Sequence, residues 1–245
     1  RYDGNLSRRR PDGNVQRNDR LMWELKNSKQ VEKNEHIRFR CTRCAACCQH
    51  VKGSIVIEGL DAYRLARHLG METADFMSQY TKPFILDDKL WYPIFSLRVK
   101  GNEDSCIFLK GTRCTVQEAK PRTCRLYPFW VEPNEPDGTD FTYHICFEHQ
   151  HHPKGSLVRV KDWMNKYFWG DDRESLQEDF RTMHILAPLL HRAREYGVEN
   201  ETIFRKVLLN RYLYFSMDEP FLPQQHRNNR ELIAFFKSMG NSKRK

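Results

Sequence analysis

Eight cysteines constrain this chain more than any other feature of its sequence. Four of them stand together in the run Cys41-Thr-Arg-Cys44-Ala-Ala-Cys47-Cys48. A two-residue gap lets two thiolates converge on one ion or one cluster from a tight turn. Adjacent Cys47 and Cys48 must point in different directions. We therefore expect one of them either to bind at a second metal position or to contact the ligand residues without binding the metal itself.

Other uses of cysteine fit this run less well. Disulfides require Cα separations of about 4.4–6.8 Å and defined Cβ directions, which four clustered cysteines cannot easily supply. The chain has 245 residues and no recognisable export signal, whereas disulfide-rich frameworks are typical of small secreted domains. A nucleophilic thiol needs one cysteine beside a base. Metal chelation is therefore favoured over buried structural thiols.

The remaining cysteines are more widely spaced, at Cys106, Cys114, Cys124 and Cys146. Gly111 provides a turn between the first two of them, and Pro121 and Pro128 restrict the backbone around the third. Taken singly, each of these cysteines could equally be a small core residue.

The whole pattern resembles the YkgJ-type CxxCxxCC cysteine-cluster family, which is a zinc- or iron-chelating domain and includes the bacterial flagellin lysine-N-methylase. The resemblance is carried by C-x-x-C-x-x-C-C, then C-x-F-L, then C-x(9)-C-R-x-Y-P-F, within residues 38–146. Ala45, Ile107 and Lys120 depart from the usual family residues. Carried over by position, the resemblance implies these metal ligands: Cys41, Cys44, Cys47, Cys48, Cys106, Cys114, Cys124 and Cys146.

Some neighbouring side chains are further candidates for the site. Arg125 follows Cys124, and we expect it to bind the cofactor by donating an N–H group to a ligand sulfur; a salt bridge is the alternative. The histidines at 149, 151 and 152, and His50, are common metal-ligand types, but a polar loop explains them equally well.

Cysteine-only ligation allows zinc or an iron–sulfur cluster. Structural zinc sites usually show two clean C-x(2–4)-C pairs, whereas this chain has one dense group and scattered single cysteines. That distribution suits a multinuclear site with remote ligands, so we favour an iron–sulfur cluster over zinc.

The fold class expected is α+β and mainly helical. We predict a polar arm over residues 1–36 with a helical turn at 22–27, a small irregular metal domain with short antiparallel strands over 37–155, and a helical layer over 156–245. In the metal domain we expect a strand at 54–58, a helix at 61–69 ending at Gly70, a helix capped by Thr73, an edge strand at 91–99 and a strand at 141–146.

In the helical part, apolar spacing predicts helices at 157–169, 173–196, 201–215 and 229–239, with Pro188 kinking or splitting the second. Two apolar stripes are expected to pack on each other, and Tyr127 to Trp130 should contact them from the metal domain. The stripes are Leu176, Phe180, Met183, Ala187 and Leu190 in one helix, and Phe204, Leu208, Tyr212 and Phe215 in the other.

The net charge is +9, but acids and bases alternate nearly everywhere, which argues against nucleic acid as a partner. The sequence has no apolar run of membrane-spanning length, and we expect a cytoplasmic location. The resemblance implies a link to protein lysine N-methylation and hence a protein substrate or partner. Since no G-x-G and no C-x-x-x-C-x-x-C occurs, an electron-transfer module and a zinc-stabilised interaction module stay open as alternatives.

Overall fold

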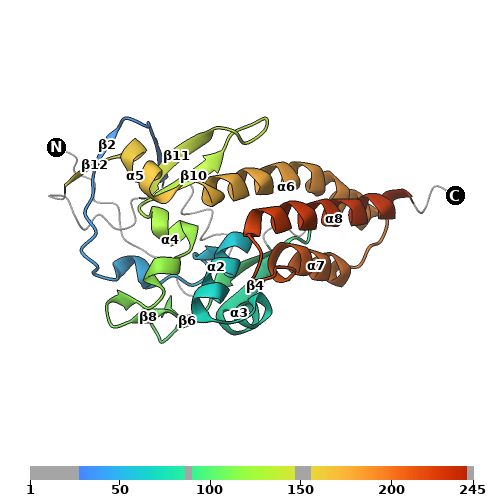
Figure 1. Cartoon of the computed structure of the whole chain (residues 1–245), viewed down its shortest axis with the longest axis horizontal. Coiled ribbons are helices and arrows are strands. Elements are labelled where there is room, and N and C mark those ends of the chain that lie inside the picture. The colour runs from blue at the N-terminus through green and yellow to red at the C-terminus, as the bar shows by residue number, and fades with distance from the viewer. Residues whose placement is uncertain (1–27, 86–89, 147–155, 242–245) are drawn as a thin grey trace.

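The computed structural model describes residues 28–85, 90–146 and 156–241. The architecture is α+β and mainly helical, as predicted. Short antiparallel strands dominate the first part of the chain, and long helices dominate the second (Figure 1). The helical turn predicted at 22–27 lies outside the described residues. Among the described helices, none is both long and apolar enough to cross a lipid bilayer.

One three-stranded sheet has the order β1-β11-β10. β11 (Phe141–Cys146) pairs antiparallel with β10 (Phe129–Pro133) on one side and with β1 (Ser28–Val31) on the other. In β11 alternate side chains are buried, as its sequence predicts. β1 belongs to the segment predicted as a polar arm, so the end of that arm is part of the sheet.

A second sheet has the order β3-β5-β4, built from β3 (Val56–Ile57), β5 (Pro93–Leu97) and β4 (Thr81–Ile85). β5 is the central strand, so the prediction of an edge strand was wrong. Pro93 is tolerated because it is the first residue of the strand, where it pairs with Ile85 at the sheet end.

Between β3 and β4 the chain forms α2 (Gly59–Leu69) and α3 (Thr73–Tyr80). Glu58 and Asp61 form a reciprocal capping box at the start of α2, and Gly70 ends it with φ 68°. Glu72, and not Thr73, occupies the cap position of α3. Thr73 is instead buried, and its hydroxyl donates a hydrogen bond to the carbonyl oxygen of Leu213 at 3.2 Å.

Two small hairpins and two short helices follow β5, and the hairpins and the second of these helices carry cysteines. Strands β6 (Val99–Lys100) and β7 (Ser105–Cys106) pair with each other, as do β8 (Leu109–Lys110) and β9 (Arg113–Cys114). The 3-10 helix η2 (Gln117–Ala119) and α4 (Arg122–Leu126) lead from these hairpins to β10.

The helix predicted at 157–169 begins later than expected. Residues Leu157–Arg159 form β12, which pairs with β2 (His36–Arg38), and α5 (Val160–Tyr167) follows. α5 packs on the β1-β11-β10 sheet, where the rings of Phe129 and Trp163 lie 6.0 Å apart. The Tyr127–Trp130 segment therefore contacts α5 through Phe129. Leu176 of the predicted α6 stripe packs against the same core, so the predicted contact with the longer helices is present in part.

The helical part consists of α6 (Asp171–Glu195), α7 (Asn200–Leu208), a π-helical turn η3 (Leu209–Leu213) and α8 (Phe221–Asn241). α6 runs unbroken through Pro188, whose side chain is exposed. α6 packs mainly along α8 (Figure 1), so its buried face is shifted from the predicted stripe. That face comprises Asp172, Ser175, Thr182, Leu186, Leu190 and Ala193.

The predicted partner stripe also faces elsewhere. Phe204 and Leu208 of α7, with Tyr212, pack against the core of the cysteine-bearing part, where Phe95 lies 4.7 Å from the Tyr212 ring. A separate core joins α6, α7 and α8 through Leu186, Leu190, Ala193, Ile203, Val207, Leu232 and Phe236. α7 therefore contributes to both cores.

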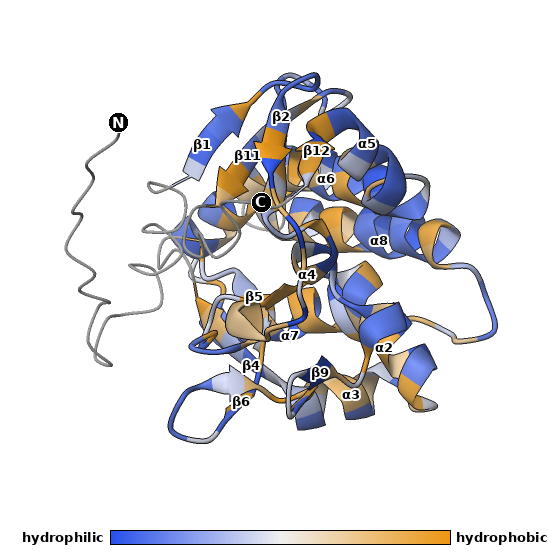
Figure 2. Cartoon of the chain, turned by 90° about the vertical axis from the view of Figure 1, so that its left-hand side faces the viewer, coloured by the Kyte–Doolittle hydropathy of each residue, from blue (hydrophilic) through white to orange (hydrophobic). Residues whose placement is uncertain are grey.

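The two strand-bearing groups lie at opposite ends of the view in Figure 2, with β1, β2, β11 and β12 near the top and β4, β5, β6 and β9 below. α4 lies between them. The segments that carry cysteines belong to both groups, so this arrangement brings distant parts of the chain toward α4.

Candidate metal centre

Six of the eight cysteines line one cavity with a volume of about 300 Å³. They come from the 3-10 helix η1 (Ala46–Cys48), from β7, β9 and α4, and from the end of β11. The structure therefore gathers six of the eight cysteines that were predicted to form the site: Cys47, Cys48, Cys106, Cys114, Cys124 and Cys146.

A left-handed backbone turn places Cys47 and Cys48. Ala45 has φ 63° and Arg43 has φ 57°, a region that is unfavourable for residues with a Cβ atom. The turn is closed by the amide of Cys48, which donates to the carbonyl oxygen of Ala45 at 2.9 Å. The Sγ atoms of Cys47 and Cys48 lie 3.9 Å apart, so both thiols remain at one wall of the cavity.

The two hairpins place the next pair. Cys106 ends β7 and is buried, while Cys114 pairs with Leu109 across the β8–β9 hairpin. Gly111 sits in that turn with φ 60°, a conformation that glycine adopts without steric cost. The predicted turn at Gly111 thus reverses the direction of the chain and brings Cys114 to the cavity.

Cys124 lies in the short helix α4, which begins after Pro121, and Cys146 is the last residue of β11. The Tyr127–Pro128 peptide is cis, and the carbonyl oxygen of Pro128 accepts a hydrogen bond from the amide of Cys146 at 2.8 Å. This bond ties the end of β11 to the chain that follows Cys124.

Cys41 and Cys44 are exposed and are not among the residues that line the cavity. Across the described ranges, no three cysteine, histidine, aspartate or glutamate side chains are arranged to hold one metal ion. The side chains of metal-ligand type that line the cavity are nevertheless six cysteines and one carboxylate, Glu58, and soft sulfur ligands suit zinc and iron–sulfur clusters. The residues therefore fit a thiolate-bound metal by donor type.

Burial and neighbouring thiols raise the pKa of three cavity cysteines, Cys47, Cys106 and Cys124. A hydrogen bond with Cys48, followed by burial, raises the pKa of Cys47. Burial raises the pKa of Cys124, with smaller contributions from Cys106, Cys47 and Cys114. Without a cation among them these thiols stay protonated at neutral pH, so a bound metal must displace their protons.

A half-buried ion pair forms one polar side of the cavity. The Nε atom of Arg122 donates to Glu58 at 3.0 Å, and its Nη2 atom contacts the other oxygen of the same carboxylate. The backbone amide of Arg122 donates to Asp61 at 2.8 Å. Burial, and next the charge of Glu58, raises the pKa of Asp61 to about 7. The start of α2 and the start of α4 are thereby joined beside Cys124.

Arg125 is held on the other side of α4. Its Nη1 atom donates to the carbonyl oxygen of Lys120 at 2.9 Å, and its Nη2 atom contacts the carboxylate of Asp172 in α6. These contacts correspond to the salt-bridge alternative. Its predicted role as an N–H donor to a ligand sulfur remains a prediction.

Sequence reasoning missed Glu58 and Asp172 as neighbours of the site. The E-x-x-D capping pattern at residue 58 could have indicated a helix start, but nothing in the sequence links it to Arg122. His50 bonds Glu103 at 3.0 Å and is not among the cavity residues. The histidines at 149, 151 and 152 lie outside the described residues.

No solved structure matches this chain. Residues 40–153 match the model of a family named CxxCxxCC and described as a putative zinc- or iron-chelating domain. The matched segment contains all eight cysteines. It also contains every element that lines the cavity with the six cysteines, which we call the thiol cavity. Residues 40–153 are therefore similar to the CxxCxxCC family, described as a putative zinc- or iron-chelating domain.

Proposed function

We propose that the thiol cavity holds an iron–sulfur cluster and that carrying this cluster is the function of the domain. The observation that supports the proposal is the number of thiols at one cavity. A structural zinc ion is complete with four ligands in tetrahedral geometry. Six cysteines line the cavity, and Cys41 and Cys44 precede it in the same loop, which exceeds the need of one ion.

The electrostatics of the lining support the same proposal. A cluster held by thiolates carries net negative charge, and nearby cations and N–H donors stabilise it. Lys120 and Arg122 both line the cavity. The charge of Lys120 also acts to lower the pKa of Cys47 and of Cys124, against the larger effects that raise them.

The walls of the cavity are otherwise apolar, with Val51, Ile55, Val116 and Phe129 among them. A dry apolar shell limits solvent access and sets the potential of a cluster. The cluster would supply one-electron chemistry, for which the surrounding residues provide ligands, counter-charges and exclusion of water.

Anaerobic purification followed by metal and sulfide analysis tests the proposal. We expect iron and acid-labile sulfide in comparable amounts, together with the broad visible absorption of sulfide-to-iron charge transfer. Cys106→Ser and Cys124→Ser should abolish that absorption, while the matched change Ser105→Ala, beside a ligand, should retain it. A stoichiometric zinc content without sulfide would instead support the zinc-stabilised interaction module.

The link to protein lysine N-methylation is a finer proposal and rests on the family resemblance. Mass spectrometry of lysine methylation on candidate protein substrates, with cluster-loaded protein and with Cys124→Ser, tests it. Methylation by neither form would leave the cluster as an electron-transfer or structural centre.

A further inference from the structure

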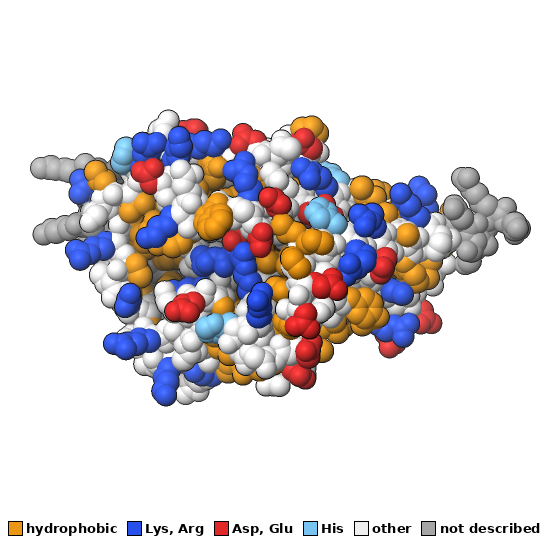
Figure 3. All heavy atoms as spheres, viewed as in Figure 1, with side chains coloured by type: hydrophobic (Ala, Val, Ile, Leu, Met, Phe, Trp, Pro, Cys, Tyr) orange, Lys and Arg blue, Asp and Glu red, His pale blue; other side chains and the backbone are white. Residues whose placement is uncertain are grey.

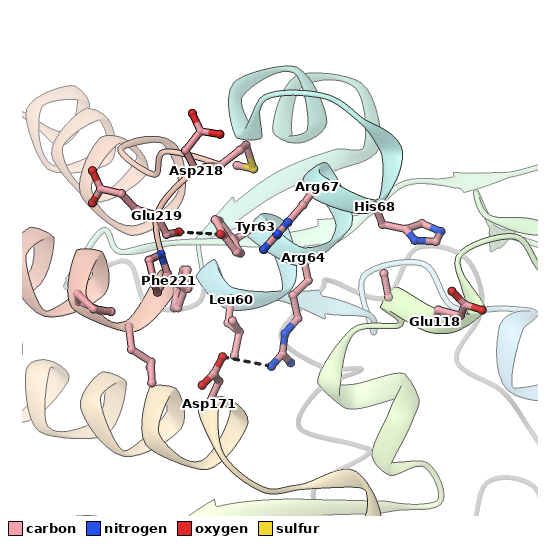
Figure 4. Close-up of a pocket in the computed structure, with 15 residues that line it drawn as sticks. Leu60, Tyr63, Arg64, Arg67, His68, Glu118, Asp171, Asp218, Glu219 and Phe221 are labelled. Atoms are coloured by element: carbon pink, nitrogen blue, oxygen red, sulfur yellow. Dashed lines mark hydrogen bonds and ion pairs between the residues drawn. The ribbon is translucent and has the colours of Figure 1, made fainter.

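A second and larger cavity lies between α2 and the beginning of α8 (Figure 4). Its volume is about 830 Å³. α2 forms one wall, the segment Met217–Pro223 forms the facing wall, and Glu118 and Asp171 stand at the edges. None of the described cysteines lines it, so this cavity is distinct from the thiol site.

The base of the cavity is apolar and fixed. Leu60, Tyr63 and Phe221 are each at most 5% exposed, and the rings of Tyr63 and Phe221 lie 5.5 Å apart. The hydroxyl of Tyr63 donates to the carbonyl oxygen of Glu219 at 2.8 Å, which joins α2 to the facing wall (Figure 4). The cavity is therefore largely formed before any ligand binds.

Some charges around the cavity are already paired. Arg64 extends toward α6, where its Nη1 atom donates to Asp172 at 2.8 Å and its Nη2 atom lies 3.9 Å from Asp171. Glu219 lies 3.5 Å from a guanidinium nitrogen of Arg227. These pairs fix the walls and leave little net charge for a ligand.

Four other charged or titratable side chains have no such pairing. Among residues 28–85, 90–146 and 156–241, the side chains of Arg67, His68, Glu118 and Asp218 take part in no hydrogen bond or ion pair. In Figure 4, His68 and Glu118 lie on one side of the cavity, Asp218 on the other, and Arg67 between them. The unpaired side chains that a ligand could contact therefore include both positive and negative charges, and they surround an apolar base.

This distribution excludes several ligand classes. A polyanion would meet Glu118 and Asp218, and a polycation would meet Arg67 beside Arg64. Nucleobases are held largely by stacking on open aromatic faces, whereas the Tyr63 and Phe221 rings are buried. The volume lies within the range of about 300–1,000 Å³ that is usual for ligand sites.

We infer that this cavity binds a peptide segment of a partner protein, in which a basic and an acidic side chain flank an apolar one. The acidic side chain meets Arg67, and the basic side chain meets Asp218. The apolar side chain lies against Met217 and Leu222, which line the cavity and are half-buried. This site is independent of the metal proposed for the cysteine cavity.

Fluorescence anisotropy with the purified full chain tests the inference. The probe is a short capped peptide of repeating lysine, leucine and aspartate. The comparison probes are a lysine–leucine peptide, an aspartate–leucine peptide and a single-stranded RNA. We expect the mixed-charge peptide to bind most tightly, with affinity that falls as salt is added.

Charge-reversal variants distinguish binding in this cavity from nonspecific attraction of the peptide to charges elsewhere on the surface. Arg67→Glu and Asp218→Lys should each weaken binding of the mixed-charge peptide about tenfold, as expected for loss of a charge-assisted hydrogen bond. Arg205→Glu, at an exposed arginine of α7, is the matched control and should leave binding unchanged. Thermal melting checks that each variant is folded.

Tighter binding of a one-sign peptide or of RNA would overturn the inference. So would the failure of every probe to bind, or binding that Arg67→Glu leaves unchanged. Because the measurement does not involve the metal, a negative result here leaves the proposed cluster untouched.

Discussion

At the scale of single residues, Gly59 decides how closely the cysteine-bearing part can approach the helical part. A Cβ atom at this position would lie 2.5 Å from the carbonyl oxygen of Arg211 and 3.4 Å from the ring of Phe221. Backbone cannot move aside as a flexible side chain can. Gly59 thus permits the first turn of α2 to pack directly on the π-helical turn.

We predict that Gly59→Ala destabilises the chain by roughly 1–3 kcal/mol, because the added methyl group overpacks this contact. Denaturant unfolding measures the change. Gly101→Ala is the control, since its Cβ would meet nothing within 4 Å and only its positive φ is strained. Equal losses for both variants would show that the approach of Arg211 is not limiting.

Asp172 is a second residue that connects parts of the chain. It is 8% exposed, and its Oδ1 atom accepts from Arg64 of α2 and from Arg125 of α4. We predict that Asp172→Asn costs on the order of 3–5 kcal/mol, because two guanidinium groups lose their shared buried counter-charge.

Differential scanning calorimetry of Asp172→Asn beside Asp171→Asn checks this prediction, since Asp171 is the exposed neighbour. If the two variants melted alike, the bridge through Asp172 would contribute little to stability.

Residue types indicated which cysteines gather at one cavity, but not which side chains would surround them. The spacing of the cysteines and the flanking motif predicted a site before any fold was known, and six of those thiols line one cavity. The pairing of Arg125 with Asp172 could not be predicted, because it joins residues that are 47 positions apart, one in α4 and the other in α6. Nothing local in the sequence encodes that contact.

At the scale of elements, the interface between α6 and α8 contains buried polar groups that apolar periodicity does not detect. Gln225 of α8 donates to Asp179 of α6 at 2.6 Å, and Arg211 of the π-helical turn lies 2.7 Å from the same carboxylate. Burial raises the pKa of Asp179 to about 6, with Arg211 acting in the opposite direction.

This raised pKa gives a pH dependence of stability with a definite sign. The unfolded chain releases the proton near pH 3.8, whereas the folded chain holds it until about pH 6. The contribution of Asp179 is therefore fully present below about pH 4 and is lost as pH rises through 6, on the order of 3 kcal/mol in all.

We predict that Asp179→Asn removes this part of the pH dependence, although it also lowers stability by leaving Arg211 without its counter-charge. Free energies of unfolding between about pH 4 and pH 7 check it, with exposed Glu231→Gln as the control. An unchanged slope in Asp179→Asn would assign the pH dependence to other groups.

Elements with a strong local signal were predicted well, and those decided by tertiary pairing were not. The helix ending at Gly70 and the alternating strand β11 are as predicted. β5 was misplaced at an edge because the sequence cannot show that Pro93 stands at the strand's first position. Residues 157–159 join a strand because β2 pairs with them, which overrides their helical periodicity.

At the scale of the whole molecule, basic and acidic side chains are interspersed over the face seen in Figure 3, in keeping with their alternation in the sequence. The predicted limits of 37–155 for the metal domain remain a prediction. Contacts do cross them, since α5 shares a core with β1, β10 and β11, and α7 shares one with the cysteine-bearing hairpins.

Substitutions at two leucines test separately the two cores to which α7 contributes. Leu232 of α8 is fully buried in the core of α6, α7 and α8, whereas Leu208 of α7 packs against the core that contains Cys106. Leu232→Ala should cost about 2–5 kcal/mol and leave the metal content per folded molecule unchanged. Leu208→Ala should lower metal retention as well, because its core supports the cysteine-bearing hairpins.

The last prediction concerns removal of the metal. The hairpins that carry Cys106 and Cys114 are two-residue strands, and such short elements depend on metal binding for part of their stability. α6 and α8 bury apolar side chains against each other, each contributing about 1.5–3 kcal/mol, so they need no metal. Chelation should therefore accelerate amide hydrogen exchange over residues 105–126 and leave α6 and α8 protected. Equal acceleration in α6 and α8 would mean that the chain unfolds as a single unit when its metal is removed.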